Sequence, residues 1–338
     1  MRERWSMCTS ITMTTKDQNV LLARTMDFAV VLDGEPTFIP RNKFVFVNDE
    51  AYDRKNDYAF VGMARQVDQE HFVFADGLNE KGLSCAALYF SGYADYNSQD
   101  EDKKYTLAPH DVVPFLLSTC STTEEVVRTM KNAQVENTAL DFLGIVLPLH
   151  WVITDKTGKS IVVEYTDQTL HIHENSIGVM TNSPDYNWHT TNLRNYIGLQ
   201  PSQKTEVHLK DMVMKPFGEG AGAFGLPGDF TPPSRFVRAT FLKNCLQDIK
   251  TELDGVTSLF HVLANVDIPK GVVKTTQAYD YTQYTTVMVN NSLNYYYKTY
   301  NNQRIRCIQL GNEDFDATSG KIWSSGDTED ILYRNTKQ

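Results

Sequence analysis

Three residues near the start of the chain have types and a spacing suited to nucleophilic chemistry. Cys8 lies in the segment MCTSITM, which is typical of a β-strand, and Arg24 and Asp27 lie in the nearby strand-like segment LARTMDF. If the two strands pair, Arg24 can stabilise a thiolate at Cys8 and Asp27 can hold an α-ammonium group. The alternative is that Arg24 and Asp27 form an ion pair at a strand end and that Cys8 is incidental.

Other catalytic motifs receive little support from the sequence. A Gly-x-Gly-x-x-Gly spacing occurs at Gly220, Gly222 and Gly225, but LPGD and a Pro-Pro pair follow it where a dinucleotide site needs a helix. We therefore predict an irregular loop there and no cofactor. Gly-x-Ser-x-Gly is absent, and Cys8 begins a strand and not the helix that a papain-like cysteine requires.

The best local metal-binding pattern is His171-x-His173, whose side chains would share one face of a strand. No acidic or histidine partner is obvious beside them in the sequence. We therefore predict two solvent-facing histidines and no metal.

Composition narrows the class of protein and its partners. The chain has 338 residues, of which 41% are hydrophobic and 22% charged, so it can bury a large core. Its formal net charge of -10 and scattered basic residues argue against a nucleic-acid partner. No apolar run is long enough for a signal peptide or a membrane span. Its five widely spaced cysteines suit a reducing compartment. We predict a cytoplasmic protein with no membrane association.

The expected elements form sheets at both ends of the chain, with helices in runs between them. A turn over 76–82 should join the strand 72–75 to a buried strand over 83–90. Such an order favours an α+β fold over a parallel βαβ fold. The region 201–232 is rich in Gly and Pro and has no clear period, and loops of that size are usually functional or contact partners. Strands are predicted over 10–14, 20–26, 44–47, 58–63, 151–154, 160–165, 170–174, 178–182, 285–290, 294–299 and 304–309, and helices over 111–119, 123–132, 234–249 and 257–265.

Several segments together resemble the choloylglycine hydrolase family, which includes penicillin V acylases and conjugated bile acid hydrolases. The matching segments span essentially the whole chain: CTS, ARTMDF, DGLNEKGL, GVMTNSP and GLPGDFTPPSRF. The resemblance implies a four-layer αββα sandwich of the N-terminal-nucleophile hydrolase type, over residues 8–338. It also implies hydrolysis of a non-peptide amide in a small-molecule substrate, without a cofactor or a metal.

The resemblance assigns roles to individual residues. Cys8 is similar to the nucleophile, and Arg24 and Asp27 occupy the places of residues that poise the thiol and hold the α-amine. Asn182 is similar to the side-chain donor of the oxyanion hole, Tyr89 stands where the family supplies a backbone N–H to that hole, and Arg235 completes the site. A free α-amine would act as the general base, so no histidine is required.

The chain departs from the family pattern because residues 1–7 precede Cys8. Either this segment is removed as a pro-segment or Met7 is the true start. The family resemblance also predicts that 201–232 is an assembly loop of a homotetramer. Tyr89 favours penicillin V acylase activity over the alternative, conjugated bile salt hydrolysis. A more remote alternative is an unprocessed ligand-binding protein without catalysis.

Overall fold

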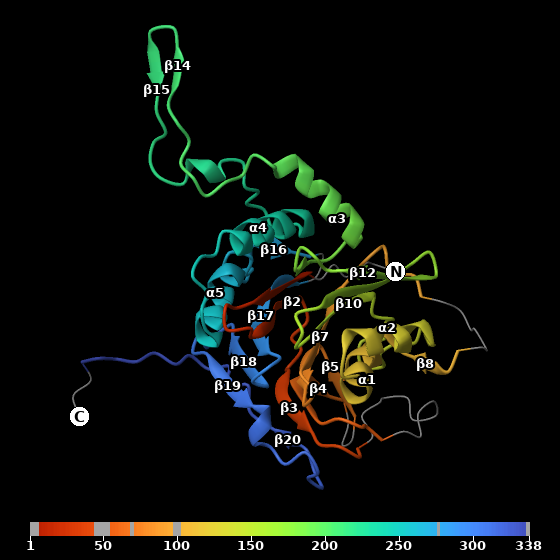
Figure 1. The fold of residues 1–338 in the computed structure, drawn as a ribbon. Helices are drawn as coiled ribbons and strands as arrows, with labels where there is room; N and C mark the ends of the chain where they lie inside the picture. The colour runs from red at the N-terminus through yellow and green to blue at the C-terminus, as the bar shows by residue number, and fades with distance from the viewer. Residues whose placement is uncertain (1–6, 44–54, 68–70, 97–102, 276–277, 336–338) are drawn as a thin grey trace.

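The computed structural model describes residues 7–43, 55–67, 71–96, 103–275 and 278–335. Two antiparallel sheets lie face to face, and a pair of helices covers the outer side of each sheet (Figure 1). The predicted α+β class and the four-layer αββα sandwich are therefore confirmed.

The first sheet combines both ends of the chain. Its order is β13-β1-β2-β17-β18-β19, and β16 pairs with β17. Every residue of β2 is buried, since one face meets the second sheet and the other meets helices. The strands are β1 (Met7–Thr14), β2 (Val20–Phe28), β13 (Val179–Met180), β16 (Val273–Lys274), β17 (Tyr279–Val289), β18 (Asn294–Thr299) and β19 (Arg306–Gln309).

The second sheet has the order β12-β11-β10-β7-β6-β4-β3-β20, and β5 pairs with β4. Strands β6 and β7 of this sheet face β1, β2 and β17 of the first. The strands are β3 (Glu35–Ile39), β4 (Phe60–Gln66), β5 (Phe72–Phe74), β6 (Asp76–Asn79), β7 (Leu83–Tyr89), β10 (Leu149–Asp155), β11 (Ser160–Thr166), β12 (Thr169–Glu174) and β20 (Lys321–Ile322).

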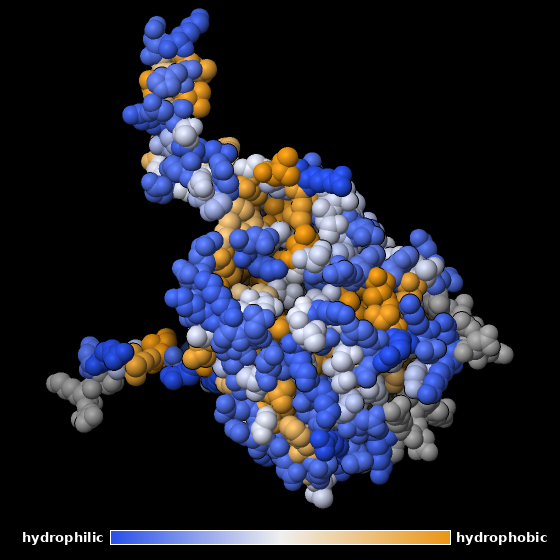
Figure 2. Space-filling view, in the orientation of Figure 1, coloured by the Kyte–Doolittle hydropathy of each residue, from blue (hydrophilic) through white to orange (hydrophobic). Residues whose placement is uncertain are grey.

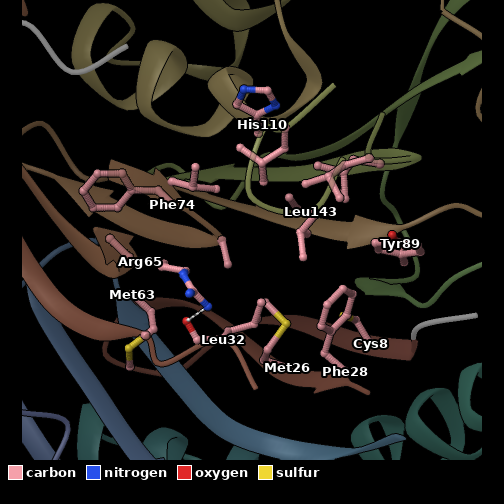
Figure 3. Close-up of a pocket in the computed structure, with 18 of the residues that line it drawn as sticks. Cys8, Met26, Phe28, Leu32, Met63, Arg65, Phe74, Tyr89, His110 and Leu143 are labelled. Carbon is pink, nitrogen blue, oxygen red and sulfur yellow. Dashed lines mark hydrogen bonds between the residues drawn. The ribbon is translucent and has the colours of Figure 1, made fainter. Parts of the chain in front are cut away.

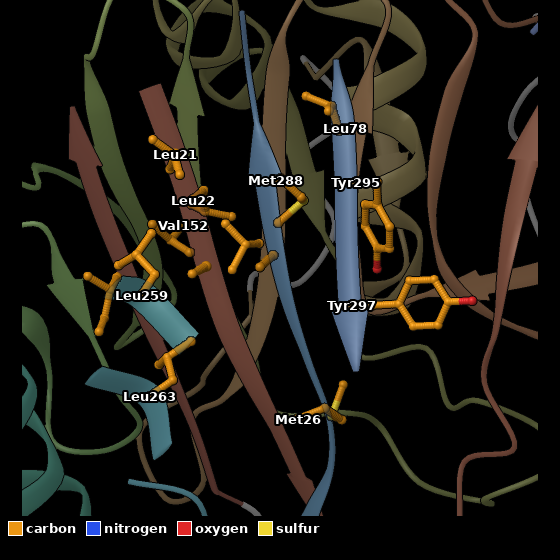
Figure 4. Packing of buried hydrophobic residues seen from close by; sticks show 14 of the residues in the cluster. Leu21, Leu22, Met26, Leu78, Val152, Leu259, Leu263, Met288, Tyr295 and Tyr297 are labelled. Atoms are coloured by element: carbon orange, nitrogen blue, oxygen red, sulfur yellow. The ribbon is translucent and has the colours of Figure 1, made fainter. Parts of the chain in front are cut away.

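The helices bury apolar side chains against the outer faces of the sheets. Helices α4 (Pro232–Asn244) and α5 (Glu252–Ala264) pack on the first sheet, and α1 (Val112–Thr119) and α2 (Thr123–Lys131) pack on the second. Leu22 and Met288 of the first sheet and Val152 of the second belong to one apolar cluster, which Leu259 and Leu263 of α5 extend (Figure 4). Other elements are α3 (Tyr186–Asn192), the parallel pair β8 (Tyr105–Leu107) and β9 (Ala133–Val135), and short 3-10 helices.

Some predicted boundaries were wrong for identifiable reasons. The segment 76–79 is strand β6 and not a turn, and β6 forms the hairpin with β7. Helix α4 ends at Asn244, earlier than predicted, and α5 begins at Glu252 after a capping box formed by Thr251 and Asp254. Helix α3 and strand β3 were not predicted. The predicted strand 44–47 lies outside the described residues.

The region 201–232 is more ordered than the predicted irregular loop. It contains a hairpin of β14 (Val207–Leu209) and β15 (Met212–Met214), which stands clear of the sandwich (Figure 1). Figure 2 shows apolar side chains on this extension, and all six residues of the two strands are exposed. The glycine-rich part contains a single 3-10 turn at Ala221–Ala223.

Candidate active site

Cys8 lies near the start of β1, on the face that points toward the second sheet. It pairs in register with Met26 of β2, and Arg24 lies two residues earlier on the same face. The Nη2 atom of Arg24 is 3.1 Å from the Cys8 Sγ. The predicted strand pairing thus brings the cation to the thiol.

Burial and the charge of Arg24 have opposite effects on the pKa of the Cys8 thiol. Burial raises the pKa of the Cys8 thiol, and the opposing attraction of Arg24 does not bring it below its usual range. The thiol is therefore protonated at neutral pH and must lose its proton to a base before or during attack on a carbonyl carbon.

Asp76, which was predicted to lie in a turn, holds Arg24 in place. Its carboxylate accepts hydrogen bonds from Arg24 Nη1 at 3.1 Å, from the Tyr284 hydroxyl at 2.9 Å and from the Tyr295 hydroxyl at 2.5 Å. Arg24 and Asp76 are both fully buried. A buried cation needs such a partner, so Asp76 fixes the guanidinium beside the thiol.

Asn182 follows β13 and lies within reach of the backbone of Cys8. The Cys8 backbone N–H donates to Asn182 Oδ1 at 2.8 Å, and Asn182 Nδ2 donates to the Tyr89 carbonyl oxygen at 2.8 Å. Tyr89 ends β7, and its ring packs edge-on against Phe28. The amide group of Asn182 is thus held between the two sheets, next to Cys8.

Arg235, on the first turn of α4, reaches the Asn182 amide from the opposite side of β1. Its Nη1 donates to the Cys8 carbonyl oxygen at 2.5 Å and to Thr9 Oγ1 at 2.7 Å, and its Nη2 donates to Asn182 Oδ1 at 2.6 Å. The Asp27 Oδ2 atom is 3.9 Å from Arg235 Nη1. Arg235 therefore links the backbone of Cys8 to Asn182 and Asp27.

An apolar pocket opens beside the thiol. Its wall includes Cys8, Met26 and Tyr89, and Figure 3 shows Arg65 well apart from Cys8. Arg65 Nη1 donates to the Leu32 carbonyl oxygen at 3.3 Å. Most of the other lining side chains are aliphatic or aromatic, which suits a largely apolar acyl group. They include Phe28, Leu32, Met63, Phe74, Leu140, Phe142, Leu143, Leu147 and Leu149.

All six residues selected from the sequence and the family resemblance lie together. Cys8, Arg24, Asp27, Asn182, Tyr89 and Arg235 are joined directly or through one another by the contacts above. Asp76 was missed because its segment was interpreted as a turn. Its type and its position before a buried strand were the signal that could have revealed it.

The histidine pair on β12 differs from the prediction. His171 and His173 are half-buried, and His173 Nε2 lies 3.5 Å from Glu164 Oε2 of the neighbouring strand β11. The acidic partner comes from the adjacent strand, which local sequence spacing does not show. Within the described residues, no group of three His, Cys, Asp or Glu side chains is placed to hold a metal ion.

Asp27 gives a testable pH dependence. Burial raises its pKa to about 6, against the attraction of Arg235. Asp27 is thus ionised above pH 6 and gains a proton as the pH falls through that value, which removes the negative charge beside Arg235 and Cys8. We expect amide hydrolysis to fall on the acidic side of pH 6. Initial rates at saturating substrate between pH 4.5 and 8 would measure this, and an acid limb that is unchanged in Asp27→Asn would contradict it.

Comparison with known proteins identifies the family. The model of the linear amide C-N hydrolases, choloylglycine hydrolase family, matches residues 8–323. The chain belongs to the choloylglycine hydrolase family. It is accordingly a linear amide C–N hydrolase, as the resemblance predicted. Within the described residues, no helix has the length and apolar character needed to cross a bilayer.

Members of the choloylglycine hydrolase family with bile-salt names are well represented among the relatives. The chain is 38% identical to the bile salt hydrolase/transferase of Clostridium perfringens, over 97% of this chain and 100% of the relative. It is 34% identical to the bile salt hydrolase/transferase of Lactiplantibacillus plantarum, over 92% of this chain and 95% of the relative. A solved structure of a conjugated bile acid hydrolase variant from C. perfringens superposes with a TM-score of 0.91 at 37% identity, over 97% and 100% of the two chains.

Penicillin V acylases of the family are more distant. The one from Pectobacterium atrosepticum is 24% identical over 72% of this chain and 64% of its own length. The sequence-based preference for penicillin V acylase over bile salt hydrolase is therefore not supported. That preference rested on Tyr89, which is a single position. The comparisons favour the alternative, with identity spread over the whole chain.

Proposed function

We propose that this protein hydrolyses the amide bond of bile salts conjugated to glycine or taurine, with Cys8 as the N-terminal nucleophile. The observation that carries this proposal is the Cys8 thiol, 3.1 Å from Arg24 and in the wall of an apolar pocket. The pocket suits the apolar acyl part of such a substrate, and the relatives with bile-salt names match nearly the full chain.

The proposed reaction begins when the α-amine of Cys8 takes the thiol proton. The sulfur attacks the amide carbon, the C–N bond breaks, and the departing amine takes that proton, which leaves a thioester on Cys8. Water then attacks the thioester, releases the bile acid and restores the thiol. An amine in place of water would give acyl transfer, which corresponds to the second activity in the relatives' names.

Asn182 and Tyr89 are proposed to stabilise the intermediate. The negative oxygen that forms on the attacked carbon needs donors placed in advance, and we assign that role to the Asn182 side-chain amide and the Tyr89 backbone N–H. The contacts of Asn182 with the Cys8 backbone and with the Tyr89 carbonyl oxygen support the assignment. In this assignment Arg24 balances negative charge on sulfur, Asp27 holds the α-amine of Cys8, and Arg235 holds the Cys8 carbonyl oxygen.

This chemistry requires Cys8 to be the first residue of the mature chain. While Met7 is attached, the Cys8 nitrogen is a peptide N–H and cannot accept the thiol proton. We propose that residues 1–7 are removed, or that Met7 is the true start and is itself removed, and the family match beginning at residue 8 supports both routes. Intact-mass analysis of active protein would reveal Cys8 at the N-terminus, whereas active protein that begins at Met1 would contradict both.

A comparison of substrates tests the proposed function. Protein with a verified N-terminus is incubated in parallel with glycocholate, taurocholate and penicillin V, and amine release is measured. We expect release of glycine or taurine to exceed cleavage of penicillin V in kcat/KM. Faster cleavage of penicillin V would contradict the proposal that conjugated bile salts are the preferred substrates. Binding of bile salts without amine release by this processed protein would favour a ligand-binding role.

We also propose that the β14–β15 hairpin assembles a homotetramer in the cytoplasm. Val207, Leu209 and Met212 expose 50%, 56% and 61% of their surface, which suits burial against another copy of the chain. Light scattering should give about four times the chain mass of 38.4 kDa. Replacing these three residues with serine should reduce the assembly, and replacing exposed Lys210 with serine should not. A monomeric wild-type protein would contradict the proposal.

A further inference from the structure

Two buried histidines contact the backbone on consecutive residues at the candidate oxyanion site. His150 Nε2 lies 2.9 Å from the Thr181 carbonyl oxygen, and His189 Nε2 lies 2.8 Å from the Asn182 carbonyl oxygen. His150 comes from β10 in the second sheet, and His189 comes from α3. Side chains from two separate elements therefore contact the backbone of Thr181 and Asn182, and the Asn182 side chain in turn contacts Cys8.

The partners of these rings determine which nitrogens are protonated. His150 Nδ1 is 2.9 Å from Glu164 Oε1, so both ring nitrogens of His150 face oxygens that accept hydrogen bonds. Because a backbone carbonyl oxygen can only accept, His150 Nε2 carries a proton and donates it to Thr181. Although burial opposes it, hydrogen bonds from His150 and His173 hold the pKa of Glu164 down at about 2. The contact between His150 Nδ1 and the Glu164 carboxylate fixes the other edge of the ring.

The protonation state of His189 follows from its burial. Burial lowers its pKa to about 4, so the ring is neutral at neutral pH. Because Nε2 faces a carbonyl oxygen, the single ring proton is on that nitrogen. The protonated Nε2 donates to the Asn182 carbonyl oxygen and also lies 3.4 Å from Thr181 Oγ1, and Nδ1 finds no hydrogen-bond partner within the described residues.

Aromatic stacking fixes the orientation of both rings. His150 stacks on Phe90 with centroids 4.2 Å apart and planes 9° apart, and His189 stacks on Phe236 at 4.7 Å and 11°. Phe90 follows Tyr89 in sequence, and Phe236 follows Arg235. Each histidine thus packs against the neighbour of another candidate site residue.

We propose that His150 and His189 are positioning residues that fix the backbone of Asn182 and thereby aim its side-chain amide at the reacting carbonyl oxygen. Among the described residues, each ring contacts the backbone at Thr181 or Asn182 and neither lines the pocket beside Cys8, so both act through Asn182. This inference rests on the proposed oxyanion role of Asn182. We call these two histidine contacts the brace. A displacement of about 1 Å at a catalytic group can cost on the order of 10²-fold in rate, so loss of the brace should reduce turnover.

The kinetic test compares two substitutions at His189. His189→Leu removes the donor to Asn182, and His189→Gln keeps an N–H donor in a similar place. We expect kcat for glycocholate to fall about tenfold to a hundredfold in His189→Leu with little change in KM, and to recover mostly in His189→Gln. His261→Leu, an exposed change on α5, serves as the control for substitution of a histidine. Unchanged kcat in a folded His189→Leu, or equal losses in both variants, would overturn the proposal.

A spectroscopic test does not depend on activity or on a stable variant. Wild-type protein labelled with ¹⁵N-histidine should show a proton on Nε2 of both His150 and His189 at pH 7, and no proton on Nδ1 of His189. His150→Gln and His189→Gln assign the signals. An unprotonated Nε2 on either ring would overturn the proposal. Wild-type protein that fails to release amine but shows both signatures would refute the proposed function while leaving the protonation states of the brace in place.

Discussion

Cys8→Ala is expected to abolish amide hydrolysis. The Cys8 sulfur is the only proposed atom that bonds to the substrate carbon, and the other groups at the site serve to orient or stabilise. Arg24 lies 3.1 Å from that sulfur and cannot replace it as the attacking atom. The measurement is release of glycine from glycocholate at enzyme concentrations high enough to detect a rate about 10⁴-fold below the wild type.

A second cysteine provides the matched control. Cys307 is exposed on the edge strand β19 and lies outside the site. Cys307→Ala should retain wild-type turnover. Mass spectrometry should also detect a thioester on the wild-type chain after rapid quenching and none on Cys8→Ala. Undiminished turnover by Cys8→Ala would show that Cys8 is not the nucleophile.

Asn182→Ala is expected to reduce kcat by about 10²–10³, because one donor to the negative oxygen of the intermediate is lost. The same change removes the acceptor for Arg235 Nη2 and for the Cys8 backbone N–H. Leaving a buried donor unpaired costs about 1–3 kcal/mol, so the free energy of unfolding should fall as well. Kinetics at temperatures well below the measured Tm separate the two effects.

The control for Asn182 is Asn195→Ala, an exposed asparagine on the 3-10 helix Leu193–Tyr196. It should leave both kcat and the unfolding free energy near wild-type values. If Asn182→Ala raised KM and kept kcat, the side chain would bind the substrate and transition state equally, and the oxyanion assignment would be wrong.

The part of the site that followed from the residues alone is the part built from neighbouring strands. Cys8 and Arg24 come from segments separated by a short turn, so alternation and antiparallel pairing suffice to place them on one face. Asn182 and Arg235 lie 174 and 227 residues from Cys8, and strand periodicity has no bearing on contacts at that distance. Only the family resemblance selected them.

Tertiary contacts explain most of what sequence analysis missed. The segment DGLN reads as a turn because its residue types favour turns, but pairing with β4 and β7 makes it a strand. His150 and His189 have no distinctive local pattern, and their partners come from other elements. The substrate preference failed because one aromatic residue, Tyr89, contains less information than similarity across the whole chain.

The ion pair between Arg24 and Asp76 joins the two layers of the sandwich. Arg24 belongs to β2 of the first sheet, and Asp76 belongs to β6 of the second. The position of the guanidinium relative to the sulfur is therefore set by the spacing between the sheets. Val152 of the second sheet and Met288 of the first belong to the apolar cluster between the layers, and its packing therefore helps to keep Arg24 and Asp76 in contact.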